Sequence, residues 1–142
     1  MEAANRGATE AGAPSIGFNI TLPHEQEPNA WSTPELTFNF HYFAVRKFHL
    51  AMRAAALVVF PGGFGTLDEL FEIVTLQQTR KMHGCPVVLY DRAFWKGLMN
   101  FKVLAEQGFI AEKDLALFRF ADSPEEIWTE LMAGGLKLPG QA

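Results

Sequence analysis

The chain has 142 residues, of which 49% are hydrophobic and 20% are charged, a composition typical of folded globular proteins and unlike that of disordered or collagen-like chains. Sixteen acidic and 12 basic side chains give a net charge of −4, which disfavours a broad surface for a nucleic acid polymer. No apolar run approaches the ~20 residues of a membrane span, and no secretory signal is visible at the start. The one cysteine, Cys85, excludes an intrachain disulfide. We therefore expect a single domain over residues 1–142, located in the reducing cytoplasm.

Composition and spacing predict the elements of the first third of the chain. The Ala- and Glu-rich start favours a helix that stops at Gly12-Ala13-Pro14, and a β-branched, apolar run then favours a strand. The predicted elements are, in chain order, a helix over 1–13, a strand over 15–22, a loop over 23–34, a strand over 36–40 and a helix over 41–54. In the last of these helices, Arg46, His49 and Arg53 fall on one polar side.

The rest of the chain alternates between strands and helices. Its predicted elements are a strand over 56–60, a helix over 66–81, a strand over 86–90, a helix over 93–107, a weaker strand over 117–121 and a helix from 123. The apolar run Ala56–Phe60 has the form of a strand buried on both faces of a parallel sheet. Ser123 is placed as an N-cap, followed by Pro124 and by Glu126 in a capping box. This order predicts an α/β, Rossmann-like parallel sheet with helices on both faces and a ligand site at the carboxyl ends of its strands.

A glycine-rich turn joins a predicted strand to a predicted helix over Phe60–Glu69, with the sequence FPGGFGTLDE. Three glycines in four positions allow backbone N–H groups to approach a ligand closely. The N-terminus of the following helix adds unpaired N–H groups and a positive dipole end, which favour a phosphate. The turn is neither a Walker loop nor the G-x-G-x-x-G dinucleotide pattern.

The candidate residues also have structural explanations. Thr66-x-x-Glu69 fits a capping box, so physics alone leaves a capping role and a chemical role for Glu69 equally favoured. Arg46 and Lys47, taken alone, are more simply explained as charges on a solvated helix face. Cys85 is more simply a small buried hydrophobe than a nucleophile. The four histidines show no paired spacing for a metal, and we assign no metal site.

The stretch Pro61–Glu69 matches the P-G-G-x-G-T-x-x-E signature of the Lonely Guy family of phosphoribohydrolases, which are often labelled lysine decarboxylases. Arg46-Lys47 resembles the R-K pair that the family carries on the helix before this strand and turn. Met1–Ala8 resembles a family helix that follows an earlier glycine-rich turn. His24-Glu25-Gln26 and His41-Tyr42-Phe43 resemble the longer bacterial branch, so the resemblance covers nearly the whole chain.

The resemblance implies hydrolysis of the N-glycosidic bond of a nucleoside 5′-monophosphate such as AMP, giving a free base and ribose 5-phosphate. Carried over by position, Arg46 and Glu69 would be catalytic and Lys47 would assist binding. The residues of the turn that would hold the substrate phosphate are Gly62, Gly63, Phe64, Gly65 and Thr66. No redox cofactor is needed, and no lysine lies in a recognisable Schiff-base context that would support a decarboxylase. Family members are commonly homodimers, which we also expect here.

The chain starts at about the residue that would follow the family's first glycine-rich turn, so we expect it to lack the N-terminal strands of the complete sheet. That expectation keeps two alternatives open. One is a nucleotide-binding or carrier module without turnover, and the other is an inactive fragment whose exposed strand edges drive association.

Overall fold

The structure is a computed structural model that describes residues 2–21, 29–138 and 140. The chain divides into two compact units, Met1–Arg53 and Ala54–Ala142. Over the described residues, none of the helices combines the length and the apolar character that crossing a membrane requires. The segment His24-Glu25-Gln26 and the first half of the predicted loop over 23–34 lie outside the described residues.

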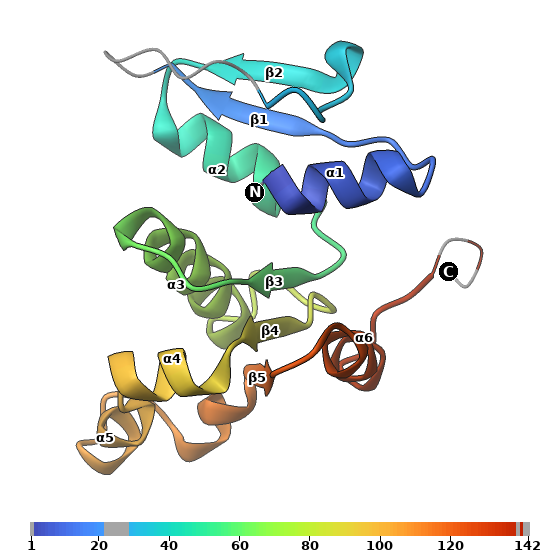
Figure 1. Cartoon of the computed structure of the whole chain (residues 1–142). Coiled ribbons are helices and arrows are strands. Elements are labelled where there is room, and N and C mark those ends of the chain that lie inside the picture. Colours follow the sequence, from blue (N-terminus) through green and yellow to red (C-terminus); the bar gives the residue numbers. More distant parts are fainter. Residues whose placement is uncertain (1, 22–28, 139, 141–142) are drawn as a thin grey trace. The chain divides into compact units, whose positions relative to one another are not determined.

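The first unit contains a two-stranded parallel sheet and two helices on the same side of it (Figure 1). Its elements are α1 (Glu2–Glu10), β1 (Gly17–Ile20), a short 3-10 helix η1 (Pro34–Leu36), β2 (Thr37–Phe40) and α2 (Phe43–Ala51). The register pairs Gly17 with Thr37 and Ile20 with Phe40. The helices and strands predicted for this part of the chain are therefore confirmed, each shorter than its predicted range and β2 by a single residue.

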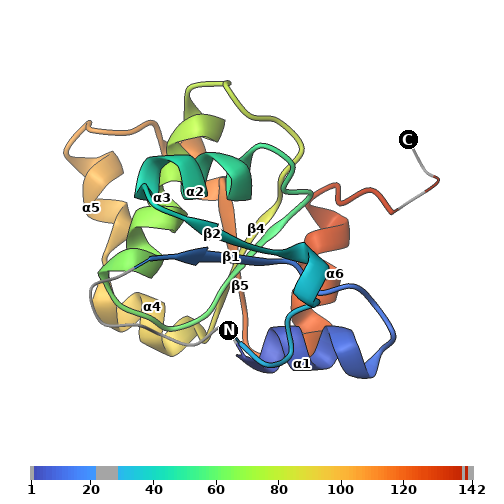
Figure 2. The ribbon, with the colours of Figure 1, turned by 90° about the horizontal axis from the view of Figure 1, so that it is seen from above.

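The second unit contains a three-stranded parallel sheet in the order β3-β4-β5. Its elements are β3 (Leu57–Val59), α3 (Phe64–Gln78), β4 (Val87–Tyr90), α4 (Arg92–Leu98), α5 (Phe101–Glu106), a 3-10 helix η2 (Glu112–Ala116), β5 (Phe118–Ala121) and α6 (Pro124–Ala133). In Figure 2, α3, α4 and α5 lie on one side of this sheet and α6 lies on the other. The parallel strands flanked by helices confirm the predicted α/β, Rossmann-like fold class.

The hydrophobic core of the second unit is centred on β4. Val87, Val88 and Leu89 are at most 1% exposed, because β4 is paired on both edges and covered on both faces. On one face, Val88 packs with Ala121 and with Leu131 of α6. The expectation that the strand over 56–60 is buried on both faces is wrong for Leu57 and Val58, which are half-buried because β3 is an outer strand of the sheet that the described residues form.

Two helices of the second unit start or divide at positions other than those predicted. The helix expected at Thr66 begins earlier, at Phe64, with Gly63 as its N-cap. The helix expected over 93–107 is two helices, because Met99 is extended and the Asn100 side chain accepts a hydrogen bond from the Lys102 backbone N–H at 3.2 Å, which starts a new helix.

Candidate functional site

The glycine-rich turn lies where the sequence predicts it, between the carboxyl end of β3 and the N-terminus of α3. Val59, the last residue of β3, is 5% exposed and anchors the turn in the core. The first helical hydrogen bond of α3 runs from the Leu67 N–H to the Gly63 carbonyl at 3.1 Å. The N–H groups before Leu67 therefore precede the helical ladder and form the positive end of the helix dipole.

The glycines of the turn are needed for space rather than for a left-handed backbone. The positive-φ glycines of the described chain lie elsewhere, and Gly63 has φ −91°. A Cβ at Gly62 would collide with the Thr66 side chain, whose Cβ would be 2.9 Å away. A Cβ at Gly63 or Gly65 would meet no atom of the described chain within 4 Å. The open space beside these two positions lies at the N-terminus of α3, where an anion would bind.

Glu69 is not part of a capping box. Thr66 is the third residue of α3 rather than its N-cap, and the N-cap Gly63 has no side chain to take part. The capping explanation for Glu69 fails because the helix starts two residues earlier than the pattern suggested. Glu69 is half-buried in the second turn of α3, on the same helix as the Gly63–Thr66 amides.

Arg46 and Lys47 lie next to each other on α2 in the first unit, and both are half-buried. Arg46 donates a hydrogen bond from Nη1 to the Phe18 carbonyl of β1 at 3.5 Å. The ring of His49, one turn further along α2, lies 5.3 Å from that of Phe40 on β2. Arg46 and His49 of α2 therefore face the β1-β2 sheet, and the explanation of Arg46 as a solvated surface charge is wrong. The structure brings Gly62–Thr66 and Glu69 together in the second unit, whereas Arg46 and Lys47 form their own pair in the first.

Sequence reasoning missed an aromatic pair beside the turn. The rings of Phe60 and Tyr90 lie 5.0 Å apart with planes inclined at 45°. Phe60 directly precedes Pro61, and Tyr90 is the last residue of β4. Each of these aromatic residues closes an apolar strand run in the sequence, but their contact depends on the register of β3 with β4, which the sequence does not contain.

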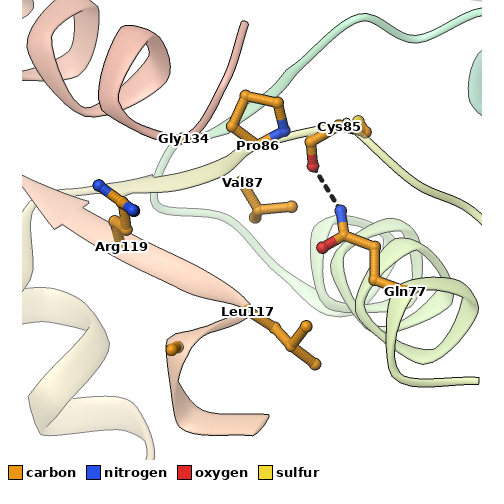
Figure 3. A pocket seen from close by; sticks show the side chains of 9 residues that line it. Gln77, Cys85, Pro86, Val87, Leu117, Arg119 and Gly134 are labelled. Atoms are coloured by element: carbon orange, nitrogen blue, oxygen red, sulfur yellow. Dashed lines mark hydrogen bonds between the residues drawn. The ribbon is translucent and has the colours of Figure 1, made fainter. Parts of the chain in front are cut away.

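A hollow of about 160 Å³ lies at the opposite, amino end of the sheet (Figure 3). Its lining includes Gln77, Cys85, Leu117 and Arg119, and the Gln77 side-chain amide donates a hydrogen bond to the Cys85 carbonyl. None of the residues proposed from the sequence as site residues lines it.

Cys85 is 3% exposed, and burial raises the pKa of its thiol, as expected for a structural cysteine. Among the described residues, no group of three or more His, Cys, Asp or Glu side chains could hold a metal ion.

The parallel sheet and the turn define a Rossmann-like α/β protein with a glycine-rich connection from strand to helix. The family model described as possible lysine decarboxylase matches residues 1–131. The chain is 35% identical over 112 residues to the probable cytokinin riboside 5′-monophosphate phosphoribohydrolase LOG4 of Oryza sativa subsp. japonica, covering 78% of this chain and 47% of that protein. It is 34% identical over 88 residues to the cytokinin riboside 5′-monophosphate phosphoribohydrolase LOG1 of Arabidopsis thaliana, covering 61% of this chain and 41% of that protein. The chain therefore belongs to this family, the Lonely Guy family.

The chain spans less than half the length of these curated relatives. The matched region includes the glycine-rich turn and the Arg46-Lys47 pair, because the family model extends from residue 1 to residue 131.

Proposed function

We propose that this chain hydrolyses the N-glycosidic bond of a nucleoside 5′-monophosphate and releases the free base and ribose 5-phosphate. In this reaction water adds to C1′ of the ribose, and the C1′–N bond breaks with its electron pair going to the base nitrogen. The proton that the water loses is passed to the base. The transition state carries positive charge on the sugar, as in other glycosyl transfers.

The observation that carries this proposal is the position of Glu69 on the helix that the glycine-rich turn opens. The Gly63–Thr66 segment offers backbone N–H groups and open space to a phosphate, with Gly62 and the Thr66 hydroxyl beside it. Glu69 is five residues beyond Phe64, which is about 8 Å along the helix axis. A phosphate at the helix N-terminus would leave the ribose within reach of Glu69.

In this proposal the Glu69 carboxylate is ionised. It stabilises the positively charged sugar in the transition state and orients the attacking water. Phosphate binding away from the reacting bond fixes the geometry of the attack.

Arg46 and Lys47 have separate proposed roles. A guanidinium is suited to holding a ribose hydroxyl or a phosphate oxygen through several donors, and an ammonium supplies a compact positive charge. We assign Arg46 a catalytic role and Lys47 a binding role, both supported by the match of the pair to the family's pattern.

The oligomeric state and the location of the chain are also part of the proposal. Val45 and Phe48 on α2 and Met52 at its C-cap recur at spacings of three and four residues and are 44%, 60% and 47% exposed, an apolar stripe that supports a homodimer. A single buried cysteine fits a reducing compartment, and we place the activity in the cytoplasm. We also propose that residues 1–142 belong to one nucleotide-binding α/β domain.

The test is release of ribose 5-phosphate from AMP, from other purine and pyrimidine monophosphates and from a cytokinin riboside monophosphate. We expect release by the unaltered chain and a loss of at least 100-fold in kcat for Glu69→Gln, because the amide cannot supply the negative charge. Glu106→Gln makes the same chemical change at an exposed position on α5 and should leave kcat unchanged. Arg46→Gln is tested in the same assay and should also lower kcat.

Each outcome of this assay has a distinct meaning. If a folded chain binds AMP but releases no product, the chain is a binding module and the hydrolase proposal is wrong. If Glu69→Gln retains full activity, the role of Glu69 is wrong even if the chain hydrolyses AMP.

A further inference from the structure

We propose that Phe60 and Tyr90 form a stacking platform for the nucleobase of the substrate. This inference rests on the proposed function and names the part of the site that would recognise the base. It assigns two side chains that belong neither to the proposed phosphate-binding residues Gly62–Thr66 nor to the Arg46, Lys47 and Glu69 set.

The two rings lie together because of the sheet register. Val58 on β3 is paired with Val88 on β4, and side chains two residues further along each strand point to the same face. Phe60 and Tyr90 occupy those positions at the carboxyl ends of the two strands, and their rings lie 5.0 Å apart. Ligand sites in parallel α/β sheets lie at this end of the strands.

Hydrogen bonds fix the backbone at the end of β4, which carries Tyr90. The indole N–H of Trp95, which is fully buried, donates a hydrogen bond to the Tyr90 carbonyl at 2.8 Å. The next backbone N–H, that of Asp91, donates to the Ala121 carbonyl of β5 at 3.0 Å. These two bonds fix the end of β4 and so the backbone that carries the Tyr90 ring.

Phe60 and Tyr90 lie on the face of the sheet that α6 covers, but they lie beyond the part that α6 covers. In the part of the chain that the structure describes, the apolar cluster under α6 includes Val58, Val88 and Ala121, but it includes neither Phe60 nor Tyr90. Phe60 is 52% exposed although it continues a strand that belongs to the core. An exposed aromatic face at this position is available to a flat, apolar ligand.

The chemistry of the proposed substrate provides such a ligand. Phe60 is joined directly to Pro61-Gly62-Gly63, so it adjoins the proposed phosphate site along the chain, and Tyr90 joins it through the ring contact. Every nucleobase presents a π-face, and stacking on an aromatic side chain is a strong and sequence-tolerant contact. The ring faces offer no hydrogen-bonding pattern that is specific to one base. We therefore expect the pair to bind purines more tightly than pyrimidines, because purines have the larger contact area.

The test compares two ligands that differ only in the base. AMP and ribose 5-phosphate are titrated calorimetrically into the chain carrying Glu69→Gln, which prevents turnover of AMP. Adding Phe60→Leu, which keeps an apolar side chain but removes the ring, should weaken AMP binding about 5- to 150-fold, the range that stacking on one ring supports. Ribose 5-phosphate binding should change by less than twofold. Phe60→Tyr retains the ring and serves as the matched control, with AMP binding near that of the parent.

Two results would overturn the platform while the proposed hydrolysis stands. One is an equal effect of Phe60→Leu on AMP and on ribose 5-phosphate, or no effect on either. The other is a change in the sedimentation of the Phe60→Leu chain while the ratio of its affinities for AMP and ribose 5-phosphate stays unaltered. That result would show that a second copy of the chain covers the pair. If the parent chain neither binds nor cleaves AMP, the proposed function itself is wrong and the platform is rejected with it.

Discussion

The turn before α3 contains two adjacent glycines that the structure constrains differently. At Gly62 a Cβ would lie 2.9 Å from the Thr66 Cβ, so Gly62→Ala forces the first turn of α3 to move. We expect this variant to lose about 1 to 3 kcal/mol of unfolding free energy, as is typical of overpacking. Urea denaturation followed by circular dichroism measures the loss.

Gly63→Ala is the matched substitution one residue later, where no atom of the described chain lies within 4 Å of the added Cβ and φ is −91°. We expect its stability to stay within about 0.5 kcal/mol of the parent. If the open space holds a substrate phosphate, the same variant should still lose most of its ribose 5-phosphate release. A stable and fully active Gly63→Ala chain would contradict the phosphate site.

Cys85 is predicted to be chemically inert in the folded chain. Burial raises the pKa of its thiol, so the folded state disfavours the thiolate, which is the reactive form. Alkylation by iodoacetamide at pH 8 should be slow in buffer and fast in urea. Rapid alkylation of the folded chain would show that the thiol is accessible.

The same shift predicts the sign of a pH effect on stability. Folding raises the pKa of the Cys85 thiol. The neutral thiol therefore makes its full contribution to the free energy of unfolding below the thiol pKa of the unfolded chain, about 8.5. This contribution is lost as the pH rises toward the higher pKa of the folded chain. The loss of stability between pH 7.5 and pH 10 should therefore be smaller in Cys85→Ala than in the parent, as measured by urea midpoints at both pH values.

At the scale of elements, the N-terminus of α6 depends on one hydroxyl. Ser123 Oγ accepts a hydrogen bond from the Glu126 N–H at 3.1 Å, as predicted. The Glu126 carboxylate, however, accepts from the Asp122 N–H at 2.8 Å rather than from Ser123, so the predicted capping box is only half formed. Ser123→Ala should cost about 1 kcal/mol in thermal or urea unfolding. Ser123→Asp keeps an acceptor and should remain close to the parent, and equal losses in both variants would argue against the cap.

Element types were predictable because strand and helix periodicities are local, whereas boundaries depend on atoms that no window of sequence contains. The split after Leu98 depends on the Asn100 side chain capping a new helix. The N-cap of α3 is Gly63, which has no side chain that a capping pattern could detect. The capping-box pattern at Thr66 and Glu69 was therefore misleading.

The candidate site shows the same division. The glycine-rich turn could be located from sequence because its glycines, proline and helix start are consecutive. The Phe60–Tyr90 pair could not, because its residues are 30 positions apart and meet only through the register of β3 with β4. The hydrogen bond from Arg46 to Phe18 likewise joins residues 28 positions apart.

At the scale of the whole molecule, the two units differ in how much apolar surface they bury. The largest fully buried side chains of the described chain, Trp95, Leu70, Leu89, Val87 and Val88, all belong to the second unit. Within residues 2–21 and 29–53, Ser15 is buried and no apolar residue is. Burial of apolar surface is the main term that opposes conformational entropy, so the two units should have unequal local stability.

Hydrogen exchange followed by mass spectrometry on the full chain tests this difference. We expect the amides of β4 to exchange only through global unfolding, since the strand is paired on both edges and its first three side chains are at most 1% exposed. The amides of β1 and β2 should exchange at least tenfold faster, through opening that leaves the second unit intact. Adding AMP to the Glu69→Gln chain should slow exchange in the turn and first turn of α3 if the phosphate binds there. Equal protection of β1, β2 and β4 without ligand would show that the chain unfolds as one cooperative unit, in which case the apolar core around Trp95 stabilises both sheets.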